Sequence, residues 1–261
     1  MRRALQSVWD EQTLRPNRIV LIEDGPLGED LRAVIAEWKQ RLGESMLVLR
    51  NGQNKGLTKS LNLGIRHIST DLIARMDSDD ISRPKRFELQ VGFLEAHPEI
   101  SIVGGDIMEF MSEKDDGQGV VRRHPYTPES IRRSIHKANP LAHSSVMMRR
   151  EIFDSGMWYN ERYRNNQDLE LWFSVLSSGR EIANIDAILV DFRICDGVFE
   201  RRGSQSARME LDIYLRGIYK LHGLRHPFYF LYPLARYLFR LMPAGLAKRA
   251  YGGAFRNAVL N

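Results

Sequence analysis

The chain has 261 residues, of which 43% are hydrophobic and 27% are charged, a composition typical of soluble globular proteins with a sizeable core. The single cysteine, Cys195, excludes an internal disulfide framework and fits a reducing compartment. The first residues carry no charged-then-apolar signal pattern, and no run approaches the roughly 20 apolar residues of a membrane span. We therefore expect a cytoplasmic protein rather than a secreted or membrane-spanning one.

The net charge of +5 is unevenly distributed along the chain. No acidic residue follows Asp212, whereas basic residues continue to the end: Arg216, Lys220, Arg225, Arg236, Arg240, Lys248, Arg249 and Arg256. Such a basic segment predicts an acidic partner, either an anionic membrane or a nucleic acid.

The first 111 residues alternate between strand and helix patterns. Apolar residues at helical spacing predict helices, and short apolar runs that end in turn residues predict strands. In chain order we expect helix 2–12, strand 18–25, helix 29–42, strand 46–51, helix 54–69, strand 71–77, helix 83–98 and strand 100–111. This alternation predicts an α/β fold in which helices cover a mainly parallel sheet.

The second half of the sequence is less regular. Its predicted elements are a polar loop at 112–119, a short capped helix within 123–140, a strand running into a helix at 144–153, a helix over 166–179 and a strand over 187–194. The helix over 166–179 places Leu169, Trp172, Phe173 and Leu176 on one face and stops at Gly179.

Acidic residues stand at the carboxyl ends of two predicted strands. One end carries Glu23 and Asp24, and the other carries Asp77, Asp79 and Asp80. Ligands of parallel sheets bind beyond these ends, so we expect the two acidic groups to converge on one crevice.

The segment IARMDSDDISRP, residues 73–84, crowds three carboxylates, which repel one another unless a positive charge lies among them. One interpretation is an acidic turn that caps the helix beginning near Pro84. The other is a site for Mg²⁺ or Mn²⁺, which bind one or two carboxylates together with substrate phosphates. The spacing of a calcium-binding loop is absent.

Five segments together resemble the family-2 glycosyltransferases, which have the GT-A fold. In chain order they are IVLIEDGPLGEDL, NKGLTKSLNLGI, RMDSDDISRPKRFELQVGFLE, NPLAHSSVMMRREIFDSG and NQDLELW. The resemblance covers roughly residues 1–195, and within the family it favours bacterial transferases of exopolysaccharide and O-antigen assembly, the amylovoran-type enzymes.

The resemblance implies a GT-A domain over 1–198, with a nucleotide-sugar half at 1–111 and an acceptor half at 112–198, followed by a basic aromatic tail at 199–261. It implies inverting, metal-dependent transfer from a nucleotide-diphosphate sugar to a hydroxyl of a lipid-linked glycan acceptor. Family members begin with a strand and loop that precede a helix like that at 2–12. This sequence starts at that helix, so we expect this 261-residue form to bind nucleotide sugar weakly or not at all.

Four aspartates match donor-side positions of the family. Asp24 matches the residue that reads the nucleotide base, and Asp77 the residue near the ribose. Asp79 matches the main ligand of Mg²⁺ or Mn²⁺, with Asp80 beside it as a further nucleotide-sugar contact. A metal bound between diphosphate oxygens stabilises the charge that develops on the leaving group.

Asp168 matches the general base that takes the proton of the acceptor hydroxyl. Gln167 stands where the family commonly has glutamate, which removes a neighbouring carboxylate but leaves the base. From the residues alone, Glu170 is nearly as suitable by helix geometry and is assigned to the acceptor side. Asp168 also has a purely structural interpretation, because a carboxylate in the first helical turn interacts favourably with the helix dipole.

Three further residues are candidates with structural alternatives. His143 is assigned to the acceptor side, although a single histidine in a strand is usually structural. Asn54 and Lys55 are assigned to the nucleotide sugar, although either could cap the helix that follows them.

Residues 226–256 interleave aromatic residues and leucines with arginines. They predict either a helical extension packed on the domain with its arginines in solvent, or an interfacial helix on an anionic membrane. Arg236 and Arg240 would interrupt a membrane span. Nucleic acid is disfavoured as a partner, because no recognised binding module accompanies the charge.

The leading hypothesis is thus a glycosyltransferase associated with the inner face of the cell membrane. A non-catalytic, degenerate transferase module that tethers a polysaccharide assembly at the membrane is the alternative. A nucleotidyltransferase also combines acidic strand ends with Mg²⁺, but its glycine-rich first loop is not visible in this sequence.

Overall fold

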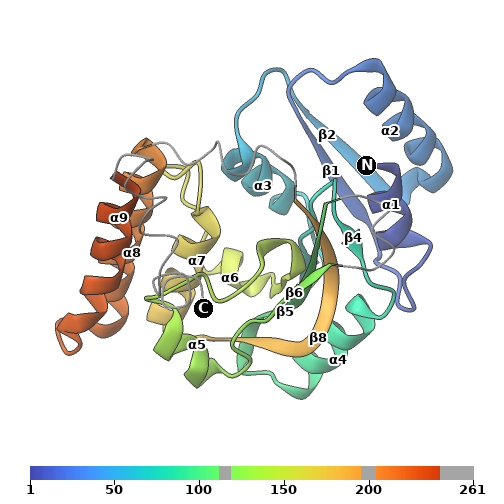
Figure 1. Cartoon of the computed structure of the whole chain (residues 1–261). Coiled ribbons are helices and arrows are strands. Elements are labelled where there is room, and N and C mark those ends of the chain that lie inside the picture. Colours follow the sequence, from blue (N-terminus) through green and yellow to red (C-terminus); the bar gives the residue numbers. More distant parts are fainter. Residues whose placement is uncertain (112–118, 195–203, 242–261) are drawn as a thin grey trace.

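The structure is a computed structural model, and it describes residues 1–111, 119–194 and 204–241 (Figure 1). In chain order the helices and strands are α1 (Arg2–Trp9), β1 (Ile19–Asp24), α2 (Glu29–Leu42), β2 (Met46–Asn51), α3 (Leu57–Ile65), β3 (Leu72–Ala74), β4 (Ile81–Ser82), α4 (Arg86–Ala96), β5 (Ile100–Phe110), β6 (Val120–Arg122), α5 (Pro128–Ser134), β7 (Met147–Arg149), α6 (Glu151–Asp154), α7 (Gln167–Ser177), β8 (Glu181–Arg193), α8 (Ser204–His222) and α9 (Leu231–Leu241).

The elements predicted from the sequence are present in the predicted order. The short capped helix is α5, which opens with a capping box in which Thr127 and Ser130 bind each other's backbone amides. Three features predicted from the sequence lie outside the described residues: most of the polar loop at 112–119, Cys195, and the end of the tail beyond Leu241.

The strands form two sheets. β1 and β2 make a parallel pair that ends with Asp24 opposite Asn51. The other sheet has the order β3-β7-β5-β8-β4, with β6 added beside β5. β5 and β8 are parallel, whereas β7 is antiparallel to β3 and β5, and β4 is antiparallel to β8. β3, β5 and β8 therefore share one direction.

The predicted α/β fold with flanking helices is confirmed. The mainly parallel arrangement holds for the β1–β2 sheet, whereas the larger sheet is mixed, with β5 and β8 as its parallel pair. Short apolar runs predict that a strand forms without fixing its direction. The two-residue β4 and three-residue β7 run against their neighbours. They nevertheless leave Asp77 just beyond the carboxyl end of β3, as the sequence predicted.

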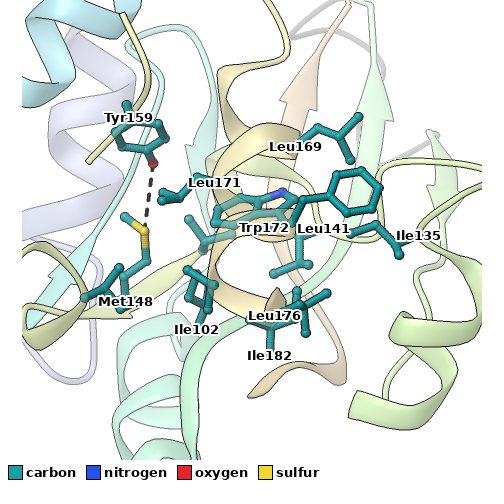
Figure 2. Packing of buried hydrophobic residues seen from close by; sticks show 14 of the residues in the cluster. Ile102, Ile135, Leu141, Met148, Tyr159, Leu169, Leu171, Trp172, Leu176 and Ile182 are labelled. Carbon is teal, nitrogen blue, oxygen red and sulfur yellow. Dashed lines mark hydrogen bonds between the residues drawn. The ribbon is translucent and has the colours of Figure 1, made fainter. Parts of the chain in front are cut away.

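A core surrounds α7, whose predicted apolar face is buried. Figure 2 shows the indole of Trp172 lying among Leu141, Leu169 and Leu171. β5, β7 and β8 supply Ile102, Met148 and Ile182 from the sheet side, and α5 and its end supply Ile131 and Ile135. This packing fixes the first turn of α7, which carries Asp168, against the sheet.

α8 completes the same core although its residues belong to the predicted tail. Its Ile213, Tyr214 and Ile218 are buried against α7. The two helices approach closely at Gly217, where an added Cβ would lie 2.3 Å from the ring of Phe173. Figure 1 shows α8 and α9 on the side of the molecule opposite to α1 and α2.

We expect Gly217→Ala to lower the free energy of unfolding by about 1–3 kcal/mol, because the new methyl group overpacks the contact with Phe173. Gly92→Ala is the matched control, since Gly92 is also helical but a Cβ there meets nothing within 4 Å. The control should gain about 0.5–1 kcal/mol from helix propensity. Urea unfolding measures the free energy of unfolding of both variants. An equal gain in stability in the two variants would contradict the close contact between α7 and α8.

α9 is the helical part of the predicted basic aromatic tail. Arg236 and Arg240 form ion pairs with Glu210 of α8, so these arginines bind the protein rather than standing in solvent. The outer side of α9 exposes four leucines: Leu231, Leu234, Leu238 and Leu241. None of the helices in the described part of the chain has the length and apolar character needed to cross a membrane.

Candidate active site

The ends of β1 and β2 build one part of the site. Gly25 directly follows β1 in a left-handed conformation, with φ +104°, and a Cβ there would lie 2.9 Å from the backbone nitrogen of Asn54. Only glycine therefore allows the loop after β2 to approach this strand end. The turn glycine in the sequence thus has a specific packing reason.

Asp24 organises that loop through hydrogen bonds. Its carboxylate accepts the backbone N–H groups of Lys55 at 2.8 Å and Gly56 at 2.9 Å, and the side-chain amide of Asn51 at 2.9 Å. Burial raises the pKa of Asp24, but these hydrogen bonds outweigh it, and the pKa lies below its ordinary value. Asp24, the residue predicted to read the nucleotide base, therefore fixes the loop that follows β2.

Asn54 and Lys55 are both exposed on this loop. The capping alternative for their side chains is wrong, because Gly56 is the N-cap of α3 and no side chain caps it. The reason is the positive φ of 90° at Gly56, which lets the backbone enter α3 directly. Both side chains remain available to a ligand.

The three carboxylates after β3 have different surroundings. Asp77 forms a bidentate ion pair with Arg75, with both nitrogen–oxygen distances 2.5 Å. Asp80 is 1% exposed and accepts the backbone N–H of Arg193 at 2.9 Å. Asp79 is exposed, and no partner for its carboxylate occurs among the described residues. The protein itself thus supplies much of the positive charge that the crowded carboxylates require.

The buried position of Asp80 fixes the end of β8 to the acidic segment. Burial raises the pKa of its carboxyl to about 6, against the lowering effect of the Arg193 N–H. The alternative that an aspartate or serine caps the next helix is wrong, because Lys85 is the N-cap of α4 and no side chain caps it. Asp80 bonds to a strand 113 residues away instead.

The donor set fits a hard divalent cation. Within residues 1–111, 119–194 and 204–241, no three His, Cys, Asp or Glu side chains form a complete metal site. Mg²⁺ and Mn²⁺ commonly use only one or two carboxylates, with substrate phosphates and water in the other positions. Asp79 is exposed, and its carboxylate has no partner in the part of the chain that the structure describes, so it is the carboxylate in this segment that best meets that requirement.

Asp168 lies in the first turn of α7 and is 9% exposed. Its Oδ2 accepts a hydrogen bond of 2.6 Å from the side-chain amide of Asn139. The Oδ1 of Asn139 accepts the indole N–H of Trp172 at 3.1 Å, and because an indole only donates, this bond fixes which end of the amide faces Asp168. Burial raises the pKa of Asp168, while the bond from Asn139 and the charge of Arg75 act against that rise.

The residue before this turn, Asn166, has a left-handed conformation with φ 56°. It is the only non-glycine residue with positive φ in the described part of the chain. Asparagine tolerates this region better than most residues, at a cost of about 1–2 kcal/mol relative to a helical residue. The chain therefore turns sharply into α7 just before Asp168.

The register of β3 with β7 brings the acidic segment after β3 close to the acceptor-side residues that precede β7. Ala74 lies opposite Met147, and the N–H of Arg75 donates to the carbonyl of Val146. The acidic segment that follows therefore runs past residues 143–145, which precede β7. Electrostatic interaction of Arg75 with both Asp77 and Asp168 fits this arrangement.

His143 and Glu170, the two residues assigned to the acceptor side, have different surroundings. His143 packs between the rings of Tyr159 and Trp172, and its Nε2 lies 2.8 Å from the hydroxyl of Tyr159. Burial, assisted by Arg75, lowers the pKa of His143 well below its ordinary value, so the ring is neutral. Glu170 accepts a hydrogen bond from Ser174, and burial raises the pKa of its carboxyl against the charge of Lys220 on α8.

Sequence reasoning missed two side chains of this site, Arg75 and Asn139. The spacing of Arg75 and Asp77 was an available signal, because residues two apart in an extended chain point to the same side. Asn139 lies within the segment NPLAHSS, in which only the histidine, His143, was predicted as a site residue. Its bond to Asp168 spans 29 residues of sequence and carries no local signal.

Known proteins that resemble this chain identify its family. A model of glycosyl transferase family 2 matches residues 1–156. The chain belongs to glycosyltransferase family 2. The amylovoran biosynthesis glycosyltransferase AmsE of Erwinia amylovora is 33% identical over 245 residues, which cover 92% of this transferase and 88% of AmsE. An Escherichia coli UDP-Gal:alpha-D-GlcNAc-diphosphoundecaprenol beta-1,3-galactosyltransferase is 29% identical over 255 residues. The aligned region covers 97% of this transferase and 90% of the Escherichia coli protein.

The fold of the transferase is also found among solved structures. The mannosyltransferase PcManGT of Pyrobaculum calidifontis, in complex with GDP-Man and Mn²⁺, superposes with a TM-score of 0.63 at 13% identity, covering 97% of this chain and 75% of that one. The resemblance to family 2 inferred from the sequence is confirmed, as is the GT-A fold.

Proposed function

We propose that this glycosyltransferase is metal-dependent and inverting, and that it transfers a sugar from a nucleotide-diphosphate donor to a hydroxyl of a lipid-linked glycan. The observation that carries the proposal is the arrangement of two acidic sites in one region. One is the exposed carboxylate of Asp79, and the other is the buried, amide-bound carboxylate of Asp168.

On this proposal, Asp168 receives the proton of the acceptor hydroxyl. Its carboxylate is held by the side-chain amide of Asn139 and by the backbone N–H of Leu169, and its remaining lone pairs are suited to accept the proton. Attack from the face opposite the diphosphate inverts the anomeric centre through an oxocarbenium-like transition state. Asn54 and Lys55, exposed beside the loop that Asp24 organises, are suited to contact the nucleotide diphosphate.

Asp79 would hold Mg²⁺ or Mn²⁺, with Asp77 close by, and the bound cation would stabilise negative charge on the leaving diphosphate. The bidentate contact from Arg75 leaves further lone pairs on Asp77, which suits the predicted role beside the ribose. Asp80 is better suited to anchor β8 than to contact a ligand, because its carboxylate is buried.

The names of the relatives support an acceptor in surface polysaccharide assembly. One relative acts in amylovoran biosynthesis, and the other transfers galactose to a diphosphoundecaprenol-linked sugar. We therefore propose exopolysaccharide or O-antigen biosynthesis at the inner face of the cell membrane. The decisive experiment incubates the protein with nucleotide sugars, Mn²⁺ and undecaprenyl-diphosphate sugars, and then determines the anomeric configuration of any product by NMR.

A product with the anomeric configuration of the donor would contradict the inverting mechanism. Transfer that is undiminished by EDTA would contradict the metal. If no donor and acceptor pair gives transfer although nucleotide binds, the tethering module becomes the better account.

The exposed leucines of α9 are suited to a membrane surface, because their helix lies in a region without acidic residues after Asp212. We expect the double variant Leu231→Ser, Leu238→Ser to weaken cosedimentation with phosphatidylglycerol vesicles by about tenfold or more. Leu89→Ser, at an exposed leucine of α4, is the matched control. Equal binding of both variants would contradict membrane association through α9.

A further inference from the structure

Arg75 is a buried cation at the carboxyl end of β3. Its side chain is 7% exposed, compared with 32% for its partner Asp77. Nη1 and Nη2 donate to the two carboxylate oxygens of Asp77, each at 2.5 Å. A planar guanidinium bound in this bidentate way fixes the orientation of the carboxylate, which a single hydrogen bond would not do.

The backbone of Arg75 is held from two sides. Its N–H donates to the carbonyl of Val146 at 3.0 Å, and its carbonyl accepts Nη2 of Arg86 at 2.7 Å. Arg86 is fully buried, and its Nε donates to Gln90 at 3.1 Å. Because strand pairing and a buried side chain both fix this backbone, Arg75 has little freedom to move away from Asp77.

A short series of contacts links Arg75 to the acceptor side. Its N–H donates to the carbonyl of Val146, and His143, three residues earlier, packs against Trp172. Trp172 in turn donates to Asn139, which donates to Asp168.

Burial raises the pKa of Asp168, and Arg75 opposes that rise together with the hydrogen bond from Asn139. Tyr159 and Tyr214 also interact with Asp168, and burial raises the pKa of each, so both are neutral. Among these described groups, Arg75 is therefore the cation that acts on this carboxylate.

We infer that Arg75 is a positioning residue that serves both halves of the site. Its guanidinium orients Asp77 for the donor, and its charge stabilises the ionised form of Asp168 for the acceptor. The inference rests on the roles of Asp77 and Asp168 in the proposed function. It assigns two separable properties of one side chain, bidentate geometry and positive charge, to two steps of the reaction.

Arg75→Lys and Arg75→Met separate these properties. Both variants lose the bidentate contact, so both should bind nucleoside diphosphate with Mn²⁺ about tenfold more weakly in calorimetric titrations. Only Arg75→Met loses the charge. Its activity should therefore appear at higher pH, with the acid limb of the kcat profile moved up by about one pH unit, whereas Arg75→Lys keeps the limb of the wild type.

The Asp77→Asn background tests how Arg75 acts on the donor. If Arg75 acts through Asp77, adding Arg75→Met to Asp77→Asn causes no further loss of nucleotide affinity but still moves the acid limb. Arg133→Met is the control, because Arg133 forms an exposed ion pair with Glu129 of the same helix, α5. This control should change neither the nucleotide affinity nor the acid limb of the kcat profile.

Circular dichroism establishes that each variant folds, and Arg75→Gln replaces Arg75→Met if the latter does not. Unchanged affinity in the Lys and Met variants would overturn the donor role. Equal acid limbs in those two variants would overturn the charge role. If wild type transfers no sugar, the proposed function fails, but nucleotide titration and the carbon-13 resonance of the Asp168 carboxyl, assigned with Asp168→Asn, still test both roles of Arg75.

Discussion

Asp168→Asn is expected to lower the rate of sugar transfer by about 10²–10⁴-fold while leaving nucleoside diphosphate binding unchanged. The amide has nearly the shape of the carboxylate but cannot take the acceptor proton. Folding should be preserved, because the variant removes a charge that burial disfavours. Single-turnover transfer and calorimetric nucleotide binding, measured on the same preparation, check the two parts of the expectation.

The pH dependence of the wild type follows from the same carboxyl. The base acts only when it is ionised, so activity is lost as the pH falls through the pKa of Asp168. Because burial raises that pKa, the loss should begin at a higher pH than the ordinary value of 3.8 implies. The acid limb should be absent from the residual activity of Asp168→Asn.

Glu170→Gln is the matched control on the same helix. Its carboxylate accepts a hydrogen bond from Ser174 and interacts with Lys220, whereas the carboxylate of Asp168 is bound by Asn139. We expect its rate to remain within about tenfold of the wild type. A large loss in Glu170→Gln with little loss in Asp168→Asn would transfer the role of the base to Glu170.

Asp79→Asn is expected to remove the Mn²⁺ dependence of nucleotide binding and to reduce transfer by about a thousandfold, since a metal typically supplies several kcal/mol of charge stabilisation. Folding should not change, because Asp79 is exposed and its carboxylate makes no bond within the described residues. Titration of nucleoside diphosphate with and without Mn²⁺ measures the first effect.

The neighbouring aspartate provides the contrast. Asp80→Asn keeps an acceptor for the N–H of Arg193, and we expect it to retain Mn²⁺-dependent binding. Asp80→Ala leaves that N–H without its acceptor and should lower the free energy of unfolding by about 1–3 kcal/mol. Loss of Mn²⁺-dependent binding in Asp80→Asn would instead make Asp80 a ligand of the cation.

Much of this transferase can be read from its sequence. Helical and strand spacing predicted nearly all the elements, because the apolar face of each element is encoded within a few residues. The stripe from Leu169 to Leu176 is buried as predicted. The order of five motifs identified the family, which the family model and the relatives confirm.

Other features depend on residues that only the folded chain brings together. The mixed strand directions, the close contact at Gly217 and the pairing of Arg236 and Arg240 with Glu210 are of this kind. So is the bond from Asn139 to Asp168. Each depends on the three-dimensional position of a partner many residues away, and local spacing carries no record of it.

The acidic segment after β3 contains both kinds of information. The sequence by itself determined that three carboxylates follow a strand end and that they need positive charge. The tertiary structure decided how that charge is supplied: Arg75 holds Asp77, the end of β8 covers Asp80, and Asp79 remains exposed. The physical reason is that charge spacing is local, whereas burial and hydrogen-bond partners depend on the whole fold.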